Sequence, residues 1–175
     1  MFSTTRSLLK LRVIFYVCYN VLMGKTIFEH FDNTILKMTR AIAVPLGRVA
    51  LFVVFFWFGF LKLLDLSPAN PLVANLLEET LPFWSFPSFV VFLGLWEMLI
   101  GIAFLIEGWE RLAIALLLPH MVTTIMPLLL LPEVAWQRML VPTLEGQYII
   151  KNIVILALAL SLAAHLRPLQ KRKSV

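Results

Sequence analysis

Four stretches of this chain are long and apolar enough to cross a lipid bilayer, and they constrain the fold more than any other feature. A membrane-spanning helix needs about 20 mostly apolar residues, because each residue rises 1.5 Å and the hydrocarbon layer is about 30 Å thick. The sequence therefore predicts an all-α, polytopic membrane protein with an antiparallel bundle of four transmembrane helices. The four stretches are 46–64, 88–106, 112–131 and 147–166.

Composition argues against a soluble protein. Apolar residues make up 61% of the 175 residues and charged residues 14%, whereas soluble domains have roughly 45–50% and about 25%. A soluble protein of this size cannot cover its surface with this few charged residues. We therefore expect the lipid bilayer to cover the surface of this protein. The single cysteine, Cys18, excludes an internal disulfide and a cysteine-bound iron–sulfur cluster. The sequence has neither a phosphate-binding glycine loop nor paired Cys/His spacing, so we expect no metal site.

Basic residues gather at the two ends of the chain, which indicates membrane orientation rather than nucleic-acid binding. The positive-inside rule then predicts a protein of the inner (cytoplasmic) membrane with both termini in the cytoplasm. Three regions follow: a basic, amphipathic extension at 1–45, the transmembrane domain at 46–166 and a basic tail at 167–175. The basic residues at the two ends are Arg6, Lys10, Arg12, Lys25, Lys37 and Arg40 before the first span, and Arg167, Lys171, Arg172 and Lys173 after the fourth, whereas the links contain Arg111 and Arg138.

The extension contains two apolar patterns. Residues 13–19 are too short a run to span a membrane, and no small-residue cleavage site follows, so we favour an uncleaved segment over a signal peptide. From Ile27 onward, apolar residues recur at helical spacing, which predicts an amphipathic helix. This helix either lies in the membrane interface or docks on a cytoplasmic partner. Its apolar residues are Phe28, Phe31, Ile35, Met38 and Ile42.

A second short helix is predicted in the link 65–87. Asn70 is a suitable N-cap and Pro71 suits the first helical position, and both precede a run of apolar residues. We expect this helix to lie over one end of the bundle.

Ionisable residues inside the stretches are the first candidates for function. A charged side chain at membrane depth costs about 2.5–3.5 kcal/mol on insertion scales, so it needs a partner, a cavity or a purpose. Glu97 lies near the middle of its stretch, whereas Lys62 and Lys151 lie in the outer halves of theirs. A lysine stem reaches about 6 Å, so either ammonium can approach Glu97. The alternatives are a purely structural ion pair and, for Lys62, a side chain that extends to the headgroups.

Small and polar residues surround these charges in the sequence. Gly94 and Gly101 share the helix face of Glu97, and Gly108 extends the row, which indicates either an open notch beside the carboxylate or close helix packing. One helical region of the fourth stretch carries donors and acceptors at two successive turns. Its polar residues, which we predict to bind a ligand together with Lys62 and Glu97, are Gln147, Tyr148, Lys151 and Asn152.

His120 is a weaker candidate for the same site. It lies near the middle of the third stretch, between Pro119 and Pro127. Its ring could relay protons, or a backbone carbonyl that a proline leaves free could satisfy it. A bis-histidine haem site is not expected, because His30 and His165 do not lie at the same depth.

Several short motifs are distributed over about 46–166. They are Phe58-Gly59-Phe60-Leu61-Lys62, Ser67-Pro68, Pro71-Leu72-Val73-Ala74-Asn75, Gly94-Leu95-Trp96-Glu97 with Gly101, Glu145-Gly146-Gln147-Tyr148, and Lys151-Asn152. Together these motifs resemble the DoxX-like family of small four-helix membrane proteins. The piece Pro71-Leu72-Val73-Ala74-Asn75 and the pair Lys151-Asn152 also resemble related inner-membrane proteins associated with resistance to reactive chlorine.

The resemblance implies a redox-linked role, because the family is named after the membrane subunit of a thiosulfate:quinone oxidoreductase. Thiosulfate itself is not carried over. Lys62, Glu97, Gln147, Lys151 and Asn152 fall on the family's motif positions, whereas His120 does not. The basic extension at 1–45 departs from the short start usual in the family, so no soluble partner is carried over either.

Three functional hypotheses follow. The first is a quinone-handling membrane subunit of respiratory or oxidative-stress chemistry, not self-sufficient as an enzyme, that receives electrons from a cytosolic or membrane partner. In this hypothesis Lys151 and Asn152 hydrogen-bond a quinone oxygen, and Glu97 exchanges a proton. The second is a transporter of a small anion or weak acid, which Lys62 and Lys151 would attract. The third is a non-catalytic assembly protein whose buried charges set helix register. The sequence leaves the substrate and the oligomeric state open.

Overall fold

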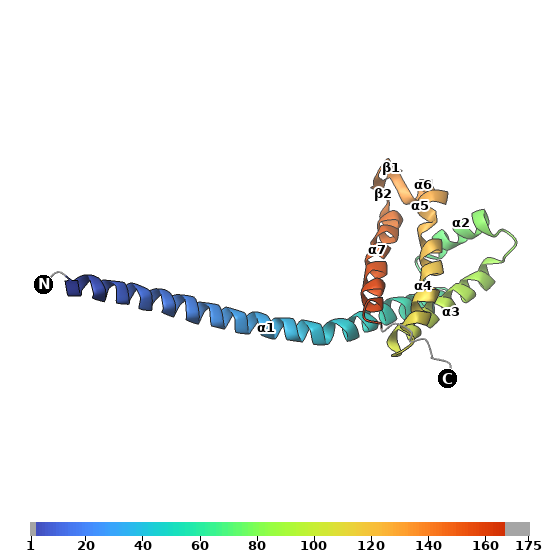
Figure 1. Cartoon of the computed structure of the whole chain (residues 1–175). Coiled ribbons are helices and arrows are strands. Elements are labelled where there is room, and N and C mark those ends of the chain that lie inside the picture. Colours follow the sequence, from blue (N-terminus) through green and yellow to red (C-terminus); the bar gives the residue numbers. More distant parts are fainter. Residues whose placement is uncertain (1–2, 167–175) are drawn as a thin grey trace, which may run out of the picture. The chain divides into compact units, whose positions relative to one another are not determined.

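The computed structural model describes residues 3–166, and the side chains of residues 3–11, 13 and 20–27 lie outside this description. The basic tail predicted at 167–175 lies outside it as well. The chain divides into two compact units, Met1–Val44 and Pro45–Val175. The first helix, α1 (Ser3–Leu63), contributes to both units (Figure 1).

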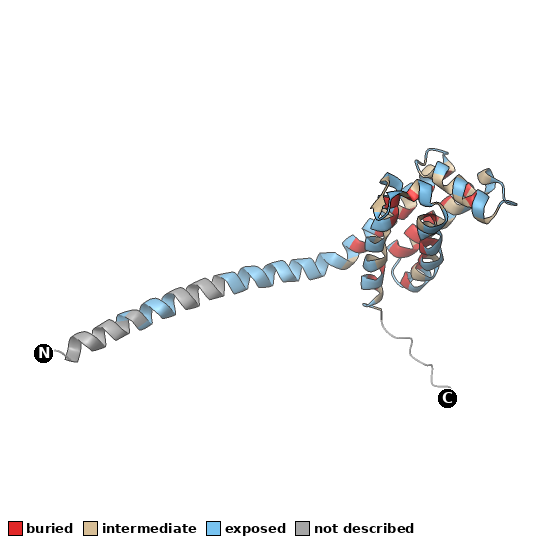
Figure 2. Ribbon diagram, turned by 90° about the horizontal axis from the view of Figure 1, so that it is seen from above, coloured by how far each residue is buried: buried red, intermediate tan, exposed pale blue. Residues whose placement is uncertain are grey.

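Within the first unit, α1 is helical from Ser3 onward. The amphipathic helix predicted from Ile27 is therefore confirmed as helix, and the apolar run 13–19 belongs to the same element. Every side chain from residue 28 to 43 is exposed, as the pale blue colour of this part of α1 shows (Figure 2). Pro45 is tolerated inside α1, at the residue where the second unit begins.

The second unit is a bundle of apolar helices, which confirms the predicted all-α membrane fold. Among the described residues, four helical segments are long and apolar enough to cross a membrane: Phe28–Leu63, Phe86–Leu105, Glu110–Leu130 and Leu144–Ala163. They correspond to the end of α1, α3 (Phe86–Leu105), α4 (Glu110–Ile125) with the one-turn α5 (Pro127–Leu130), and α7 (Leu144–Ala163).

The last three helices begin two or three residues earlier than predicted, and α7 shows why. The Thr143 hydroxyl accepts a hydrogen bond from the backbone N–H of Gly146 at 3.1 Å and donates one to the Val134 carbonyl at 2.6 Å. Thr143 is therefore an N-cap that starts α7 at Leu144. The prediction placed the start at Gln147 because apolar periodicity does not register a cap.

The helix predicted in the first link is present as α2 (Asn70–Thr80). Its cap differs from the prediction: Ala69 occupies the N-cap position, and Asn70 is already helical. The Asn70 amide donates instead to Asp65 Oδ1 at 2.7 Å, because Asp65 turns back toward it in a left-handed conformation (φ 56°).

The second link contains structure that the sequence patterns did not predict. A short helix, α6 (Pro132–Ala135), is followed by a two-stranded antiparallel hairpin of β1 (Trp136–Arg138) and β2 (Val141–Pro142). The turn between the strands places Leu140 in the left-handed region (φ 61°). Because α2 contacts α3 and α5, and α6 and β2 contact α7, both links lie at the same end of the bundle (Figure 1).

The core of the bundle is small and built from α1, α3, α4 and α7. Leu51, Ile100, Phe104, Ala113 and Leu117 are almost inaccessible, and red segments mark this interior in Figure 2. Large apolar side chains cover the outside of the same helices, which is the arrangement expected where lipid replaces water. Examples are Val53, Trp57 and Phe60 of α1, Leu95 and Leu99 of α3, Val122 of α4, and Ile153 and Val154 of α7.

Candidate functional site

Three ionisable side chains from three helices meet inside the bundle. Lys62 Nζ of α1 donates a hydrogen bond to Glu97 Oε2 of α3 at 2.6 Å. On the other carboxylate oxygen, Oε1, His120 Nε2 of α4 lies at 3.4 Å. All three residues are buried, with 5%, 6% and 8% of their surfaces exposed. We call Lys62, Glu97 and His120 the buried triad.

Two glycines position the lysine and the carboxylate. A Cβ atom on Gly59 of α1 would lie 2.5 Å from the Gly94 carbonyl oxygen, and one on Gly94 would lie 2.7 Å from the Gly59 carbonyl oxygen. The two backbones therefore touch where α1 crosses α3. Each missing side chain also leaves room for a triad residue, since the same two positions are 3.0 Å from Glu97 Cβ and 3.2 Å from Lys62 Cβ.

Gly59 was not among the predicted site residues. Its signal in the sequence was a lone glycine one turn before Lys62 in a stretch of large apolar residues. Small residues at such positions favour close helix approach in membranes. The partner glycine on the other helix becomes apparent once the two helices are paired.

The predicted notch beside Glu97 is filled. α1 occupies the space beside Gly94, and a Cβ on Gly101 would lie 2.9 Å from the Phe56 backbone nitrogen. Gly94 and Gly101 therefore serve close helix packing, the alternative left open by the sequence. The extension of this row to Gly108 is wrong: Gly108 lies in the turn between α3 and α4, with φ 88° and no atom within 4 Å of its Cβ position. Gly108 takes part in no helix packing among the described residues, and its left-handed backbone conformation forms the turn.

The imidazole of His120 is packed on several sides, and one of its ring nitrogens has no hydrogen-bond partner in the part of the chain that the structure describes. The Phe55 ring meets the imidazole edge-on at 5.6 Å between centroids. The Thr123 and Thr124 hydroxyls both donate to the His120 backbone carbonyl at 2.8 Å. Among the described residues, the buried Nδ1 atom has no hydrogen-bond partner.

The expectation that a free carbonyl satisfies the imidazole is therefore wrong for the described residues. The ring of His120 turns its Nε2 toward Glu97 instead. Electrostatic attraction to a carboxylate explains this orientation better than a neutral carbonyl does.

The polar residues of α7 do not join the triad. Gln147, Tyr148 and Lys151 are exposed, and Asn152 is half-buried. Lys151 Nζ lies 5.1 Å from the centroid of the Tyr148 ring, on the outer side of the helix. The buried residues of this part of α7 are Gly146 and Ile149, and they belong to another face of the helix.

Of the two lysines expected to approach Glu97, Lys62 is the one that pairs with it. The Glu97–Lys151 pair does not form, because Lys151 lies on an exposed face of α7. The alternative in which Lys62 extends to the headgroups is also wrong, since its ammonium is buried against Glu97. Of the predicted ligand-binding set, the structure brings together Lys62, Glu97 and His120.

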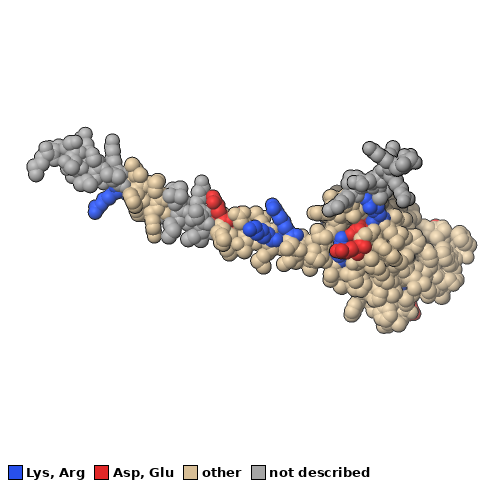
Figure 3. All heavy atoms as spheres, turned by 60° about the horizontal axis from the view of Figure 1, so that its bottom comes forward, with Lys and Arg blue, Asp and Glu red and all other residues tan. Residues whose placement is uncertain are grey.

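A second group of charges lies at the opposite end of the bundle, beside the turn between α3 and α4. Arg48 Nη2 of α1 donates to Glu110 Oε1 of α4, and Arg48 Nη1 lies 3.4 Å from Glu107 Oε1. Glu110 is buried, whereas the Glu107 side chain is 91% exposed. Figure 3 shows basic and acidic side chains in a compact group on this unit, with mostly uncharged surface around them.

This Arg48 group was not predicted. Arg48 lies near the start of the predicted first stretch, and Glu110 lies just before the predicted third stretch. Opposite charges about 60 residues apart carry no local signal, so their contact follows from how α1 packs on α4.

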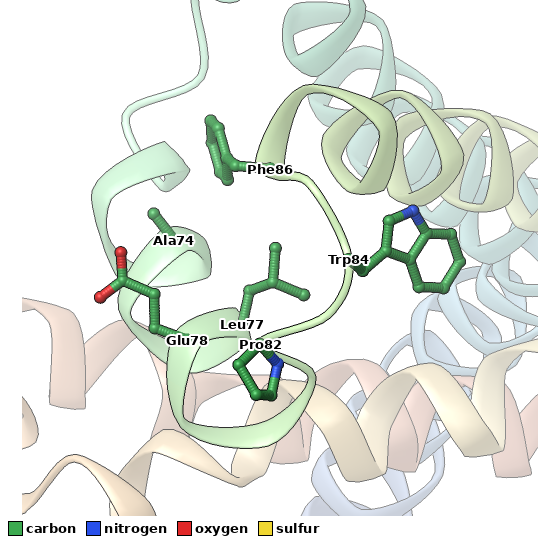
Figure 4. Close-up of a pocket in the computed structure, with 6 residues that line it drawn as sticks. All are labelled: Ala74, Leu77, Glu78, Pro82, Trp84 and Phe86. Atoms are coloured by element: carbon green, nitrogen blue, oxygen red, sulfur yellow. The ribbon is translucent and has the colours of Figure 1, made fainter.

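A separate cavity of about 230 Å³ lies between the end of α2 and the start of α3. In Figure 4, Leu77 and Phe86 point toward its centre, whereas the Glu78 carboxylate points outward. No residue of the buried triad lines it. Its lining residues are Ala74, Leu77, Glu78, Pro82, Trp84 and Phe86.

The triad can hold and pass protons. A carboxylate between an ammonium and an imidazole, all shielded from water, interacts with both more strongly than at an exposed surface. Imidazole accepts a proton on one nitrogen while it releases one from the other. Among the described residues, no group of three or more His, Cys, Asp or Glu side chains has the arrangement of a metal site.

Compared with models of known protein families, with curated proteins and with solved structures, this chain matches none.

Proposed function

We propose that this protein is a DoxX-like, quinone-handling subunit of the inner membrane, and that the buried triad is its proton-exchanging site. The observation that carries the proposal is His120 Nδ1. It is a buried polar atom with no partner among the described residues, in a ring whose other nitrogen faces Glu97. Such an atom is costly to bury unless a ligand satisfies it for part of the time.

The donor set fits a quinone headgroup. His120 would hold a quinone oxygen through Nδ1, with Phe55 and the surrounding apolar side chains excluding water. A bound quinone supplies two-electron, two-proton redox chemistry. The sequence supports the same assignment, because Lys62 and Glu97 fall on motif positions of the family that the chain resembles.

In this proposal His120 and Glu97 transfer the proton, and Lys62 stabilises the charge of the carboxylate. When the quinone is reduced, the imidazole would give the proton on Nδ1 to the quinone oxygen and take a proton at Nε2 from protonated Glu97 Oε1, 3.4 Å away. Lys62 stabilises the resulting carboxylate through its hydrogen bond to Oε2. In this proposal the electrons come from a partner protein, as in the first hypothesis drawn from the sequence.

The positive charges of the extension and the tail support an orientation with both termini in the cytoplasm. In this orientation the Arg48 group lies toward the cytoplasm, and α2 and the β1–β2 hairpin lie on the opposite side.

Quinone binding by the purified full chain in lipid nanodiscs tests the proposal. With a short-chain ubiquinone as probe, we expect His120→Phe to weaken binding about tenfold, which corresponds to one lost hydrogen bond of about 1.4 kcal/mol. Lys151→Met is the matched control, because this lysine is exposed, and we expect it to bind as the original chain does. Equal binding by all three proteins, or loss in Lys151→Met alone, overturns the proposal.

One observation favours a structural role as a second candidate. Lys62 and Glu97 already pair with each other at a glycine crossing, so they can fix the register of α1 on α3 without any ligand. This candidate predicts that the double variant Lys62→Met/Glu97→Met folds and leaves cellular function intact. A stable double variant without function favours the proton-exchanging site instead.

A further inference from the structure

The first unit carries an apolar seam that no described residue covers. Its side chains are between 45% and 72% exposed, which is costly for large apolar groups in water. The polar residues of the same segment, including Glu29, Asn33, Lys37 and Arg40, lie on other faces of the helix. The seam consists of Phe28, Phe31, Ile35, Met38 and Ile42.

The spacing of the seam identifies the kind of surface that covers it. Successive members are separated by three, four, three and four residues, an average of 3.5. A repeat of 3.5 keeps one narrow stripe in contact with another helix over its whole length. The same register passes through Ile14 and Val17, which are also exposed. The seam therefore has the a and d pattern of a coiled coil.

We propose that the seam pairs with the same seam of a second copy of this chain, as a parallel two-stranded coiled coil. All copies in one membrane insert in the same direction, so identical seams run parallel and in register. Phe28, Ile35 and Ile42 then occupy a positions, and Phe31 and Met38 occupy d positions. The β-branched side chains of Ile35 and Ile42 at a positions suit a two-stranded pair.

Charge also favours a second helix over the lipid surface. Residues 28–43 contain Glu29 and Asp32 against Lys37 and Arg40, so the net charge of this segment is zero and it has no excess positive charge for anionic headgroups. The excess positive charge of the extension lies before it, at Arg6, Lys10, Arg12 and Lys25. In the parallel pair, position 34 faces position 39 of the other copy, and both are threonine. Position 32 faces position 27, an isoleucine, so no like charges oppose each other across the seam.

The area is sufficient for a specific contact. The exposed aromatic and aliphatic side chains of residues 14–42 on two copies would remove roughly 1,000 Å² from water, the size at which specific interfaces begin. The pairing involves the first unit of each copy and does not depend on the function proposed for the triad.

Disulfide trapping in membranes tests the pairing with the full chain. In a Cys18→Ser background, Ile35→Cys places a thiol on the seam and Asn33→Cys places one on the opposite face. At an a position of a parallel pair, the Cα atoms come within the 4.4–6.8 Å that a disulfide bridges. Under mild oxidation we expect at least fivefold more covalent dimer from Ile35→Cys than from Asn33→Cys.

A second measurement keeps the result interpretable. In the Cys18→Ser/Ile35→Cys protein, adding Phe31→Asp should abolish the cross-link while the membrane bundle stays folded, because residue 31 belongs to the other unit. Equal cross-linking at positions 33 and 35 overturns the proposal. So does a thiol at position 35 that resists a water-soluble maleimide yet forms no dimer, since lipid or an unrelated helix then covers the seam.

Discussion

Lys62 and Glu97 show at the level of single residues how a membrane interior treats charge. Each neutralises the other within hydrogen-bonding distance, and both are almost inaccessible. Removing one partner leaves an unpaired charge in a medium that solvates it poorly. We expect Lys62→Met to lower the free energy of unfolding by about 3 kcal/mol, and the further change Glu97→Met to restore most of it.

Reversible unfolding in mixed detergent micelles measures this double-mutant cycle. Lys151→Met is the control, because its ammonium lies over the Tyr148 ring on the exposed side of α7 and its loss should change stability by less than about 1 kcal/mol. Additive effects of the two substitutions would show that the pair does not interact in the membrane.

The sequence predicted that Lys62 and Glu97 belong to the site, but it did not predict which lysine contacts Glu97. Glu97 and Lys62 stood out because charges inside apolar stretches are rare and costly. The choice of Lys62 over Lys151 depended on which face each helix turns inward, and apolar residues on nearly all sides of these stretches hide that face. Gly59 was missed for a related reason, since a glycine acquires its role from the backbone that approaches it.

At the level of the elements, the crossing of α1 and α3 depends on having no side chain at two positions. A Cβ on Gly94 would lie 2.7 Å from the Gly59 carbonyl oxygen, closer than real contacts allow, and the obstacle is backbone. We expect Gly94→Ala to force the helices apart, to cost about 1–3 kcal/mol and to separate Lys62 from Glu97.

Gly47→Ala is the matched control for this effect. Its Cβ would lie 3.2 Å from Leu158 Cδ1, the end of a flexible side chain that can move. Thermal unfolding of both variants in the same detergent makes the comparison. A Gly94→Ala protein as stable as Gly47→Ala would mean that α1 and α3 do not cross at this point.

The Arg48 group links α1 to the start of α4 at the other end of the bundle. Glu110 is buried against the guanidinium, so Glu110→Gln should lower stability by about 1–3 kcal/mol. Glu107→Gln should have little effect, because that carboxylate is exposed and its ion pair is screened by water. Unfolding measured at low and high salt distinguishes them: we expect the Glu110 effect to persist in salt, and equal effects of the two variants would contradict this view.

Sequence patterns predicted the elements that neighbouring residues determine and missed those that lack a local signal. The last three apolar stretches and the helix after Asn70 depend on nearby residues and were found within about three positions. The first stretch was predicted to begin at residue 46, whereas its helix, α1, begins at Ser3. The β1–β2 hairpin was not found, because Leu140 supplies its left-handed turn without the Asn or Gly that usually marks one. Pro45, which ordinarily breaks a helix, lies inside α1.

For the whole molecule, the membrane is the partner that the fold requires. The bundle buries a small core and leaves large apolar side chains outside, an arrangement that water would not support. The two ends of the bundle differ in composition: one carries the Arg48 group, and the other carries α2 and the hairpin. With the basic extension and tail, this difference is the basis for the proposed orientation.

Accessibility from the two sides of the membrane tests that orientation. In a Cys18→Ser background, Glu107→Cys marks the turn between α3 and α4, and Met139→Cys marks the hairpin, where Met139 is 90% exposed. A membrane-impermeant maleimide added to intact spheroplasts should label Met139→Cys and leave Glu107→Cys unmodified, and inverted vesicles should give the reverse. One membrane-spanning segment, Glu110–Leu130, lies between the two marker positions, so they must lie on opposite sides of the membrane. Labelling of both from one side would contradict the four-span bundle itself, whereas an exchanged pattern would keep the bundle and reverse the assignment of the termini.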